Sequence, residues 1–210
     1  MDRLSGEDDT HGVAPGSRIG VFGGTFDPVH TGHLVAATWA REELDLDRVL
    51  FVVAGEPWQK VGRRVVTPAE DRFRVVTAAV EGTEGLEASR LELDRTGPSY
   101  TADTVHELLA ADPGVFLYLV VGADVAGELD TWQRVDEIRD VVTLVIVDRG
   151  GVATSPDPAG WKVERLRIPG LDISSSELRQ RLAEGRTVQF LIPDAAIRCI
   201  RRLNLYAGGR

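Results

Sequence analysis

Residues 19–34 read IGVFGGTFDPVHTGHL, and the order of residue types in this stretch sets the expectation for the fold. The apolar run at 19–22 is typical of a strand that is buried on both faces. Gly23 and Gly24 follow it directly, and a helical pattern begins near residue 33. A strand, a glycine turn and a helix in this order form the first half of a βαβ unit, which predicts a parallel sheet.

The rest of the chain repeats this alternation of apolar runs and helical patterns. We expect strands at residues 19–22, 49–54, 86–93, 115–122, 142–147 and 161–168, and helices at 33–46, 67–80, 101–111, 132–139, 174–185 and 193–203. The run at 86–93 alternates more than the others and should lie nearer an edge of the sheet. This spacing predicts an α/β fold with a mostly parallel sheet, helices on both faces and ligands at the carboxyl ends of the strands.

Two helix starts carry the spacing of a capping box, Ser/Thr-x-x-Glu. Thr67 should be the N-cap of one helix, with Pro68 at its first position and Glu70 at its third. The same spacing between Ser174 and Glu177 should open another helix.

The composition limits the class of protein. The chain has 210 residues, of which 43% are hydrophobic, and we expect one domain at 18–206 between tails at 1–17 and 207–210. A net charge of −9 argues against a nucleic-acid surface. No apolar run approaches the roughly 20 residues of a membrane helix. The single cysteine, Cys199, cannot form an intrachain disulfide, which favours a cytoplasmic protein.

The turn at Gly23 and Gly24 has the elements of an anion site. Glycine lets a ligand approach the main chain closely, and the following helix directs free N–H groups and a partial positive charge at the same point. The segment lacks the Gly-Lys-Ser/Thr of a Walker A loop and the spacing of the G-x-G-x-x-G fingerprint. It therefore predicts phosphate binding of another kind.

His30 and His33 distinguish this turn. Both should lie at its mouth, where an imidazole with a pKa near about 6.5 can donate a hydrogen bond to phosphate and carry a positive charge. Two alternatives remain: a metal pair and a chance pair of surface histidines. A metal pair lacks further histidine ligands, because His11 lies in the tail and His106 in the middle of a predicted helix.

The stretch GGTFDPVHTGH (23–33) is similar to the T/H-x-G-H signature of the nucleotidyltransferase superfamily, whose members have a Rossmann-like, doubly wound fold. In this form it most resembles the nicotinate-nucleotide adenylyltransferase family. Further segments occur in that family's order. The segment that contains Lys60 resembles the actinobacterial form of the family's lysine loop. The further segments are GEPWQK (55–60), PSYTADT (98–104), GADVAGELDTW (122–132), VIVDRGG (145–151) and ISSSELRQR (173–181).

The resemblance implies that the adenylyl group of ATP is transferred to nicotinate mononucleotide, giving nicotinate adenine dinucleotide and pyrophosphate in NAD biosynthesis. The mononucleotide phosphate is the nucleophile, and with a second pKa near about 6 it is largely dianionic at neutral pH. No general base or covalent intermediate is then needed, and catalysis rests on positioning and charge stabilisation. Mg²⁺ should arrive with ATP, without a dedicated protein site.

By the same resemblance, catalysis falls to His30, His33, Lys60 and Arg179. The implied ATP site consists of Gly23, Gly24, Thr25, Phe26, His30, His33, Gly122, Asp124, Ile173, Ser174, Ser175 and Arg179. From the residues alone, Lys60 could be a solvated lysine, Arg179 a surface arginine and Asp124 an N-cap. Ser176 stands where the family commonly has threonine, and it keeps the hydroxyl.

The implied site for nicotinate mononucleotide consists of Thr25, Lys60, Tyr100, Thr101, Trp132 and Arg149. Trp132 can stack on the cationic pyridinium ring, although a tryptophan of the core is the ordinary alternative. Tyr100 and Thr101, at a helix start, can present N–H groups to the nicotinate carboxylate, which would favour it over uncharged nicotinamide. Arg149 is expected to meet the mononucleotide phosphate.

Two other functions compete. One is a related transferase that acts on nicotinamide mononucleotide or phosphopantetheine, against which the PSYTADT segment and the spacing to Trp132 speak. The other is a non-catalytic nucleotide-binding module, which would not need His30, His33, Lys60 and Arg179 together. The sequence leaves open the formation of a homo-oligomer and the degree of selectivity for nicotinate.

Overall fold

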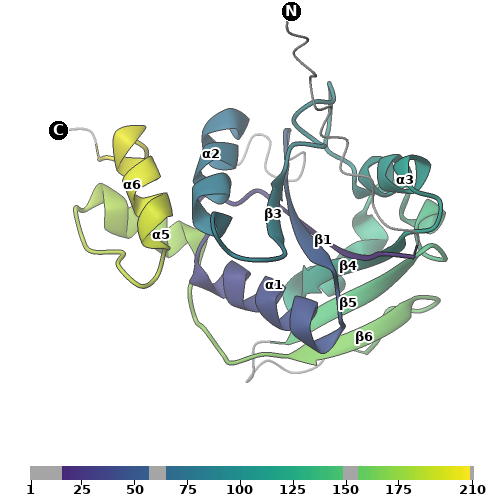
Figure 1. The fold of residues 1–210 in the computed structure, drawn as a ribbon. Coiled ribbons are helices and arrows are strands. Elements are labelled where there is room, and N and C mark those ends of the chain that lie inside the picture. Colours follow the sequence, from purple (N-terminus) through teal and green to yellow (C-terminus); the bar gives the residue numbers. More distant parts are fainter. Residues whose placement is uncertain (1–15, 57–64, 149–155, 209–210) are drawn as a thin grey trace, which may run out of the picture.

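Strand β1 (Arg18–Gly24), which carries the opening apolar run, lies inside the sheet between β2 (Arg48–Val53) and β4 (Phe116–Gly122). The computed structural model describes residues 16–56, 65–148 and 156–208, and in these ranges six strands form one sheet in the order β3-β2-β1-β4-β5-β6 (Figure 1). The remaining strands are β3 (Leu86–Ser89), β5 (Val142–Asp148) and β6 (Lys162–Arg167). All pairings are parallel, which confirms the predicted Rossmann-like α/β fold.

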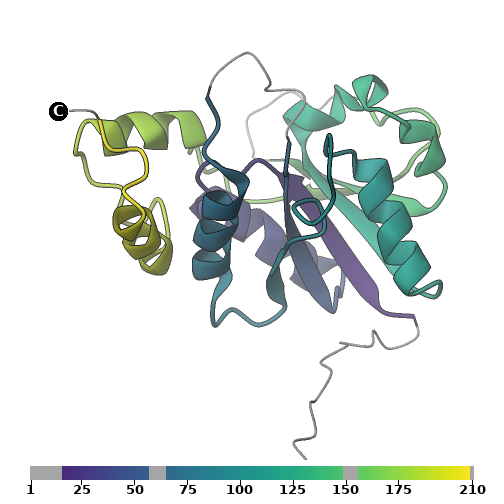
Figure 2. The same cartoon turned by 90° about the horizontal axis from the view of Figure 1, so that it is seen from above.

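Helices cover both faces of this sheet (Figure 2). One face carries α1 (Thr31–Glu43), α2 (Ala69–Val80) and α6 (Asp194–Arg202), whose apolar residues share one core cluster. The other face carries α3 (Thr101–Ala111). Shorter elements are α4 (Ala123–Ala126), the 3₁₀ turns η2 (Leu129–Thr131) and η3 (Val135–Glu137), and α5 (Ser175–Ala183).

Burial on both faces explains the continuous apolar runs in the sequence. Along β2, Val49 and Phe51 point into the cluster beneath α1 and α2, whereas Leu50 and Val52 point into the cluster beneath α3. Because successive strand residues face opposite sides, each strand inside the sheet must be apolar at nearly every position. Strand β3 is shorter than predicted and lies at an edge, as expected from its alternating pattern.

The helix predicted at residues 132–139 is wrong. The structure has the short turns η2 and η3 in this region, and Arg134 between them adopts a left-handed φ of 58°. A side chain rarely takes this conformation, and a single such residue interrupts a helix. The Arg134 guanidinium donates to Glu137 and to Asp103 on α3, so contacts with a distant element accompany the local helix break.

The capping box predicted at Thr67 is also wrong. Helix α2 begins at Ala69 with Pro68 as its N-cap and has no side-chain cap. The Glu70 carboxylate, one of the two side chains of that box, pairs instead with Arg90 at 2.7 Å. At Ser174 the N-cap half of the predicted box is confirmed, because Ser174 Oγ accepts from the Glu177 N–H at 3.2 Å.

Helix α1 begins at Thr31, earlier than predicted, which makes His30 its N-cap. His30 therefore belongs to the turn between β1 and α1, whereas His33 lies in the first helical turn. In the three described ranges, every helix is too short or too polar to cross a membrane.

Candidate active site

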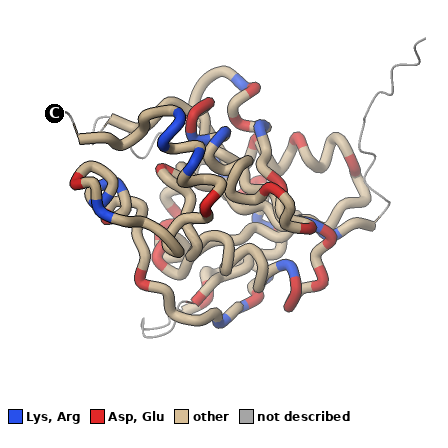
Figure 3. Tube along the Cα trace, turned by 60° about the vertical axis from the view of Figure 1, so that its left-hand side comes forward, with Lys and Arg blue, Asp and Glu red and all other residues tan. Residues whose placement is uncertain are grey.

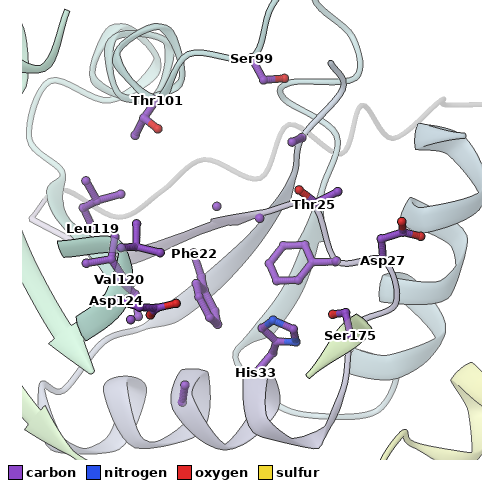
Figure 4. A pocket seen from close by; sticks show the side chains of 18 of the residues that line it. Phe22, Thr25, Asp27, His33, Ser99, Thr101, Leu119, Val120, Asp124 and Ser175 are labelled. Atoms are coloured by element: carbon purple, nitrogen blue, oxygen red, sulfur yellow. The ribbon is translucent and has the colours of Figure 1, made fainter. Parts of the chain in front are cut away.

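The candidate site lies where the strand order reverses. From β1 the chain adds β2 and β3 on one side and then returns to add β4 on the other. Helices leave β1 and β4 toward opposite faces, which opens a crevice at their carboxyl ends. A cavity of about 540 Å³ occupies this position, a volume typical of small-molecule sites. Figure 4 shows Thr101 and Ser99 on one side of it and His33 and Ser175 on the opposite side.

At the two glycines that end β1, an added side chain would have different consequences. A Cβ on Gly24 would come within 2.8 Å of the Phe26 ring, so a larger residue would displace that ring. A Cβ on Gly23 would meet no protein atom within 4 Å, and Gly23 lines the cavity. A side chain at position 23 would therefore take up space in the cavity itself.

The turn after these glycines is held by an aromatic cluster. Phe26 has a left-handed φ of 48° and is 3% exposed. Its ring packs edge-on against Phe22, with ring centres 5.7 Å apart, and edge-on against His33 at 5.1 Å. A bulky residue rarely adopts a positive φ, so the surrounding packing must maintain this turn.

The two histidines have different positions. His33 lines the cavity, and its ring extends from α1 toward it (Figure 4). His30 is 3% exposed and is not one of the lining residues; its ring stacks on His33 with centres 3.7 Å apart. The His30 N–H donates to Nδ1 of His33 at 3.2 Å. Because an accepting nitrogen carries no proton, neutral His33 has its N–H at Nε2.

The start of α5 meets the same turn from the other side. Ser174, Ser175 and Arg179 line the cavity, as does Ser176, whereas Ile173 lies outside the lining and packs on the core. Ser175 Oγ donates to Pro28 O at 2.9 Å, and Arg179 Nη1 donates to Asp27 O at 2.7 Å. The N-terminal ends of α1 and α5 thus converge, and both favour an anion.

The other end of the cavity contains the residues predicted for the mononucleotide. Tyr100, the N-cap of α3, and Thr101, its first residue, both line it. Trp132 lines it as well, while part of its ring packs on the core cluster beneath α3. The flat indole and the free N–H groups of a helix start therefore face one space.

Gly122 and Asp124 line the cavity at the carboxyl end of β4. Asp124 lies in the first turn of α4, beside Val120 and Phe22 in Figure 4. Lys60 and Arg149 fall outside the described residues.

Sequence reasoning missed two buried acidic groups at this site. Glu92 lines the cavity, is 7% exposed, and accepts from the Thr104 hydroxyl at 3.0 Å; burial raises the pKa of its carboxyl. Asp27 is 1% exposed, and its Oδ1 accepts from the Tyr206 hydroxyl at 2.7 Å. The Asp27–Tyr206 pair spans most of the chain, so local patterns carried no signal for it.

The site must attract anions in a protein whose net charge is −9. Figure 3 shows acidic and basic residues interspersed along the chain. Since exposed charges in water act over about 10 Å or less, local donors decide the affinity of this cavity. These donors are the helix ends, His33 and Arg179. Within the described part of the chain, no group of three or more His, Cys, Asp or Glu residues is placed to hold a metal ion.

Comparison with known proteins identifies relatives over most of the chain. A family model described as cytidylyltransferase-like matches residues 21–181. A Corynebacterium kroppenstedtii protein named "Probable nicotinate-nucleotide adenylyltransferase" is 41% identical over 192 residues, covering 90% of each chain. A Thermus thermophilus protein of the same name is 45% identical over 189 residues, covering 90% of this chain and 99% of its own.

A solved structure has the same fold at lower identity. It is the Plasmodium falciparum nicotinic acid mononucleotide adenylyltransferase complexed with NaAD, with a TM-score of 0.74 and 20% identity. The match covers 90% of this chain and 97% of that one.

Proposed function

Because the chain belongs to the nicotinate-nucleotide adenylyltransferase family of cytidylyltransferase-like proteins, we propose that it transfers the adenylyl group of ATP to nicotinate mononucleotide. The products are nicotinate adenine dinucleotide and pyrophosphate. One observation supports this most: a single cavity at the switch point joins two converging helix starts to the Tyr100, Thr101 and Trp132 end. One end suits a triphosphate and the other a flat ring with a carboxylate.

The reaction needs no group to remove a proton. An oxygen of the mononucleotide phosphate attacks the α-phosphorus of ATP, the bond from that phosphorus to the bridging oxygen breaks, and pyrophosphate leaves with the electron pair. Charge moves onto the leaving group during this step. Preorganised donors that face this charge lower the barrier.

His33 and Arg179 are the donors best placed for this role. His33 lines the cavity, and its N–H is at Nε2 because Nδ1 accepts from the His30 N–H; we assign this N–H to the α-phosphate. Arg179 stands over the turn, bonded to Asp27 O at 2.7 Å and to Ser176 Oγ at 3.0 Å, at the rim where the β- and γ-phosphates would lie. His30, buried behind His33, would act through it by stacking and by holding Nδ1. Lys60 and Arg149 remain proposals from sequence alone.

The carboxylates of the site fit a Mg²⁺ ion that arrives bound to the nucleotide. Asp27 points its carboxylate to Tyr206, and among the described residues carboxylates do not gather into a cage. Mg²⁺ retains several waters and needs few protein ligands when phosphates hold it. When bound, it would neutralise charge on the β- and γ-phosphates.

The mononucleotide would bind with its ring at Trp132 and its carboxylate at the start of α3. Stacking of a cationic pyridinium on indole contributes about 0.5–2 kcal/mol. The N–H groups of Tyr100 and Thr101 favour a carboxylate over an uncharged amide, since a helix start attracts negative charge. This arrangement predicts a preference for the nicotinate form.

A paired-substrate assay tests the proposal. Pyrophosphate release from Mg²⁺·ATP is measured with nicotinate mononucleotide and, separately, with nicotinamide mononucleotide. We expect clear release with the nicotinate form and a lower kcat/KM with the amide. Release with the amide alone would overturn the substrate assignment, and release with neither would support a module that only binds nucleotide.

A further inference from the structure

Arg72, on α2, is a buried arginine that the proposed chemistry does not use. It is 1% exposed, and its guanidinium donates to backbone carbonyls of three separate segments. Nη1 donates to Thr25 O at 2.7 Å, in the turn after β1. Nη2 donates to Ala54 O at 2.7 Å and Gly55 O at 3.3 Å, at the end of β2. Nε donates to Thr67 O at 2.8 Å, just before α2.

Arginine is the one side chain suited to this position. Its planar guanidinium presents five N–H donors in a fixed fork, so it can bind carbonyls that lie in different directions at once. A lysine ammonium has three donors at a single point on a flexible stem. Because burying a charge costs free energy unless its hydrogen bonds are made, these bonds fix the three segments relative to one another.

The bond to Thr25 O determines the direction of the next amide. Among the described residues the cis peptide bond lies at Asp27–Pro28, so the bond between Thr25 and Phe26 is trans. In a trans peptide the C=O and the N–H point in opposite directions. Thr25 O points at Arg72, which is not one of the lining residues, whereas Thr25 and Phe26 both line the cavity. The Phe26 N–H therefore points to the side opposite Arg72, and Phe26 lies in the cavity wall.

The next carbonyls of the turn, Asp27 O and Pro28 O, are also bound by side chains, but these side chains line the cavity. Arg179 binds Asp27 O and Ser175 binds Pro28 O, and both side chains line the cavity. A bound nucleotide could draw these two groups away from the turn. Arg72 holds Thr25 O from outside the cavity lining, directly before Phe26 with its left-handed φ of 48°.

We propose that Arg72 is a positioning residue, which orients the peptide between Thr25 and Phe26 so that the Phe26 amide donates to a nucleotide phosphate. This rests on the proposed function, because it assumes that the cavity binds a phosphate of ATP or of the mononucleotide. Arg72 itself touches neither substrate. Its effect should appear in nucleotide affinity, through a single amide.

Phenylalanine-selective ¹⁵N labelling tests this directly, because the chain has six phenylalanines. The Phe26 amide signal is identified by its loss in Phe26→Leu. Mg²⁺·ATP and nicotinate mononucleotide are then titrated separately into the wild-type protein. We expect the Phe26 amide to show the largest shift of the six with one of the two nucleotides, and the responding titration identifies the phosphate. No Phe26 shift with either would overturn the proposal.

Variants test the part played by Arg72. Arg72→Lys keeps the charge but loses the forked N–H donors of the guanidinium. In this variant we expect the Phe26 shift to fall by half or more. The dissociation constant of the nucleotide that causes the shift should rise about tenfold. Val76→Ala is the matched control, because Val76 is fully buried one turn later on α2 and contacts the core. It should lower the melting temperature and leave the dissociation constant within about twofold of wild type.

Two results with the variants would contradict the role. One is a folded Arg72→Lys that binds as tightly as wild type with an unchanged Phe26 shift. The other is a loss of affinity in Val76→Ala equal to that in Arg72→Lys. The wild-type titration decides whether the Phe26 amide meets a phosphate; if Arg72→Lys does not fold, Arg72→Gln, whose amide group has two N–H donors, takes its place with the same expected losses. A wild type that binds both nucleotides but releases no pyrophosphate would contradict the proposed function and leave the inference about Arg72 standing.

Discussion

At the scale of single residues, the proposed chemistry depends on which atom of each side chain faces the cavity. His33 lies in a first helical turn, and its Nδ1 is occupied by the His30 N–H at 3.2 Å. Only Nε2 can then donate to phosphate, so the backbone has selected the tautomer. Trp132 both lines the cavity and packs on the core cluster beneath α3, whereas Tyr206 packs on the opposite cluster and donates its hydroxyl to Asp27.

We predict that His33→Ala lowers kcat by about 10²-fold or more and changes the KM for the mononucleotide much less, because the donor acts mainly on charge that develops in the transition state. Steady-state kinetics of pyrophosphate release measure both constants. His106→Ala is the matched control: His106 is partly exposed on α3, 3.8 Å from Glu137 and outside the cavity lining. An unchanged kcat in His33→Ala would refute the role.

Trp132→Ala should chiefly raise the KM for nicotinate mononucleotide, by roughly 2- to 30-fold if ring stacking contributes about 0.5–2 kcal/mol. Trp161→Ala is a close control, since Trp161 packs on the same core cluster and does not line the cavity. Kinetics with each substrate varied in turn give the two KM values. An effect confined to ATP, or an equal effect in the control, would show that the mononucleotide site was wrongly placed.

Tyr206→Phe should lower the free energy of unfolding by about 1–3 kcal/mol near pH 7, because a buried Asp27 oxygen loses its donor at 2.7 Å. Burial raises the pKa of the Tyr206 hydroxyl above the ordinary 10.0, and the charge of Asp27 raises it further. The neutral form thus belongs to the folded state. The neutral hydroxyl therefore contributes fully to the free energy of unfolding below about pH 10, the pKa in the unfolded chain. This contribution is lost as the pH rises from there through the raised pKa of the folded protein.

Denaturant unfolding of wild type and Tyr206→Phe at several pH values checks this. The difference between the two proteins should stay constant from pH 7 to about pH 9 and shrink above about pH 10. The chain has three tyrosines, and the other two are present in both proteins, so they cancel in the difference. A difference that grows with pH would contradict the assigned bond.

At the scale of elements, the site is built from the starts of α1, α3 and α5. The sequence predicted α3 and α5 well because their start signals are local. Ser174 Oγ accepts from the Glu177 N–H within one turn, and α3 runs from Thr101 to Ala111 as expected. The helix expected at 132–139 is absent: Arg134 has a left-handed φ of 58°, and its guanidinium bonds Asp103 on another element as well as Glu137 in the same segment. A pattern in one segment cannot contain such a competing interaction.

The cap of α5 provides a test at this scale. Ser174→Ala should destabilise the protein by about 1 kcal/mol and raise the KM for ATP, because the first turn of α5 positions Ser175 and Arg179 against the β1–α1 turn. Gln180→Ala on the same helix is the control: it loses a 2.8 Å bond to Glu184 and leaves the helix start intact. Equal KM values for ATP in wild type and Ser174→Ala would show that this helix start does not bind the nucleotide.

At the scale of the whole molecule, the strand order fixes where the site must lie. The sequence predicted a parallel sheet and a turn that binds anions, since both have local patterns. It did not predict the cross-chain supports of that turn: Thr25 and Arg72 lie 47 residues apart, and Asp27 and Tyr206 lie 179 apart. Only the folded chain brings these pairs together, and their residue types have no distinctive spacing.

Titration calorimetry of Mg²⁺·ATP with wild type and with Gly23→Val tests the central claim, that the nucleotide occupies the cavity at the switch point. A Cβ on Gly23 would meet no protein atom within 4 Å, Gly23 lines that cavity, and valine suits a strand. We predict that wild type binds ATP and that Gly23→Val, with an unchanged melting temperature, binds it at least about tenfold more weakly. Equal affinity in the two proteins would place the nucleotide elsewhere and contradict the claim.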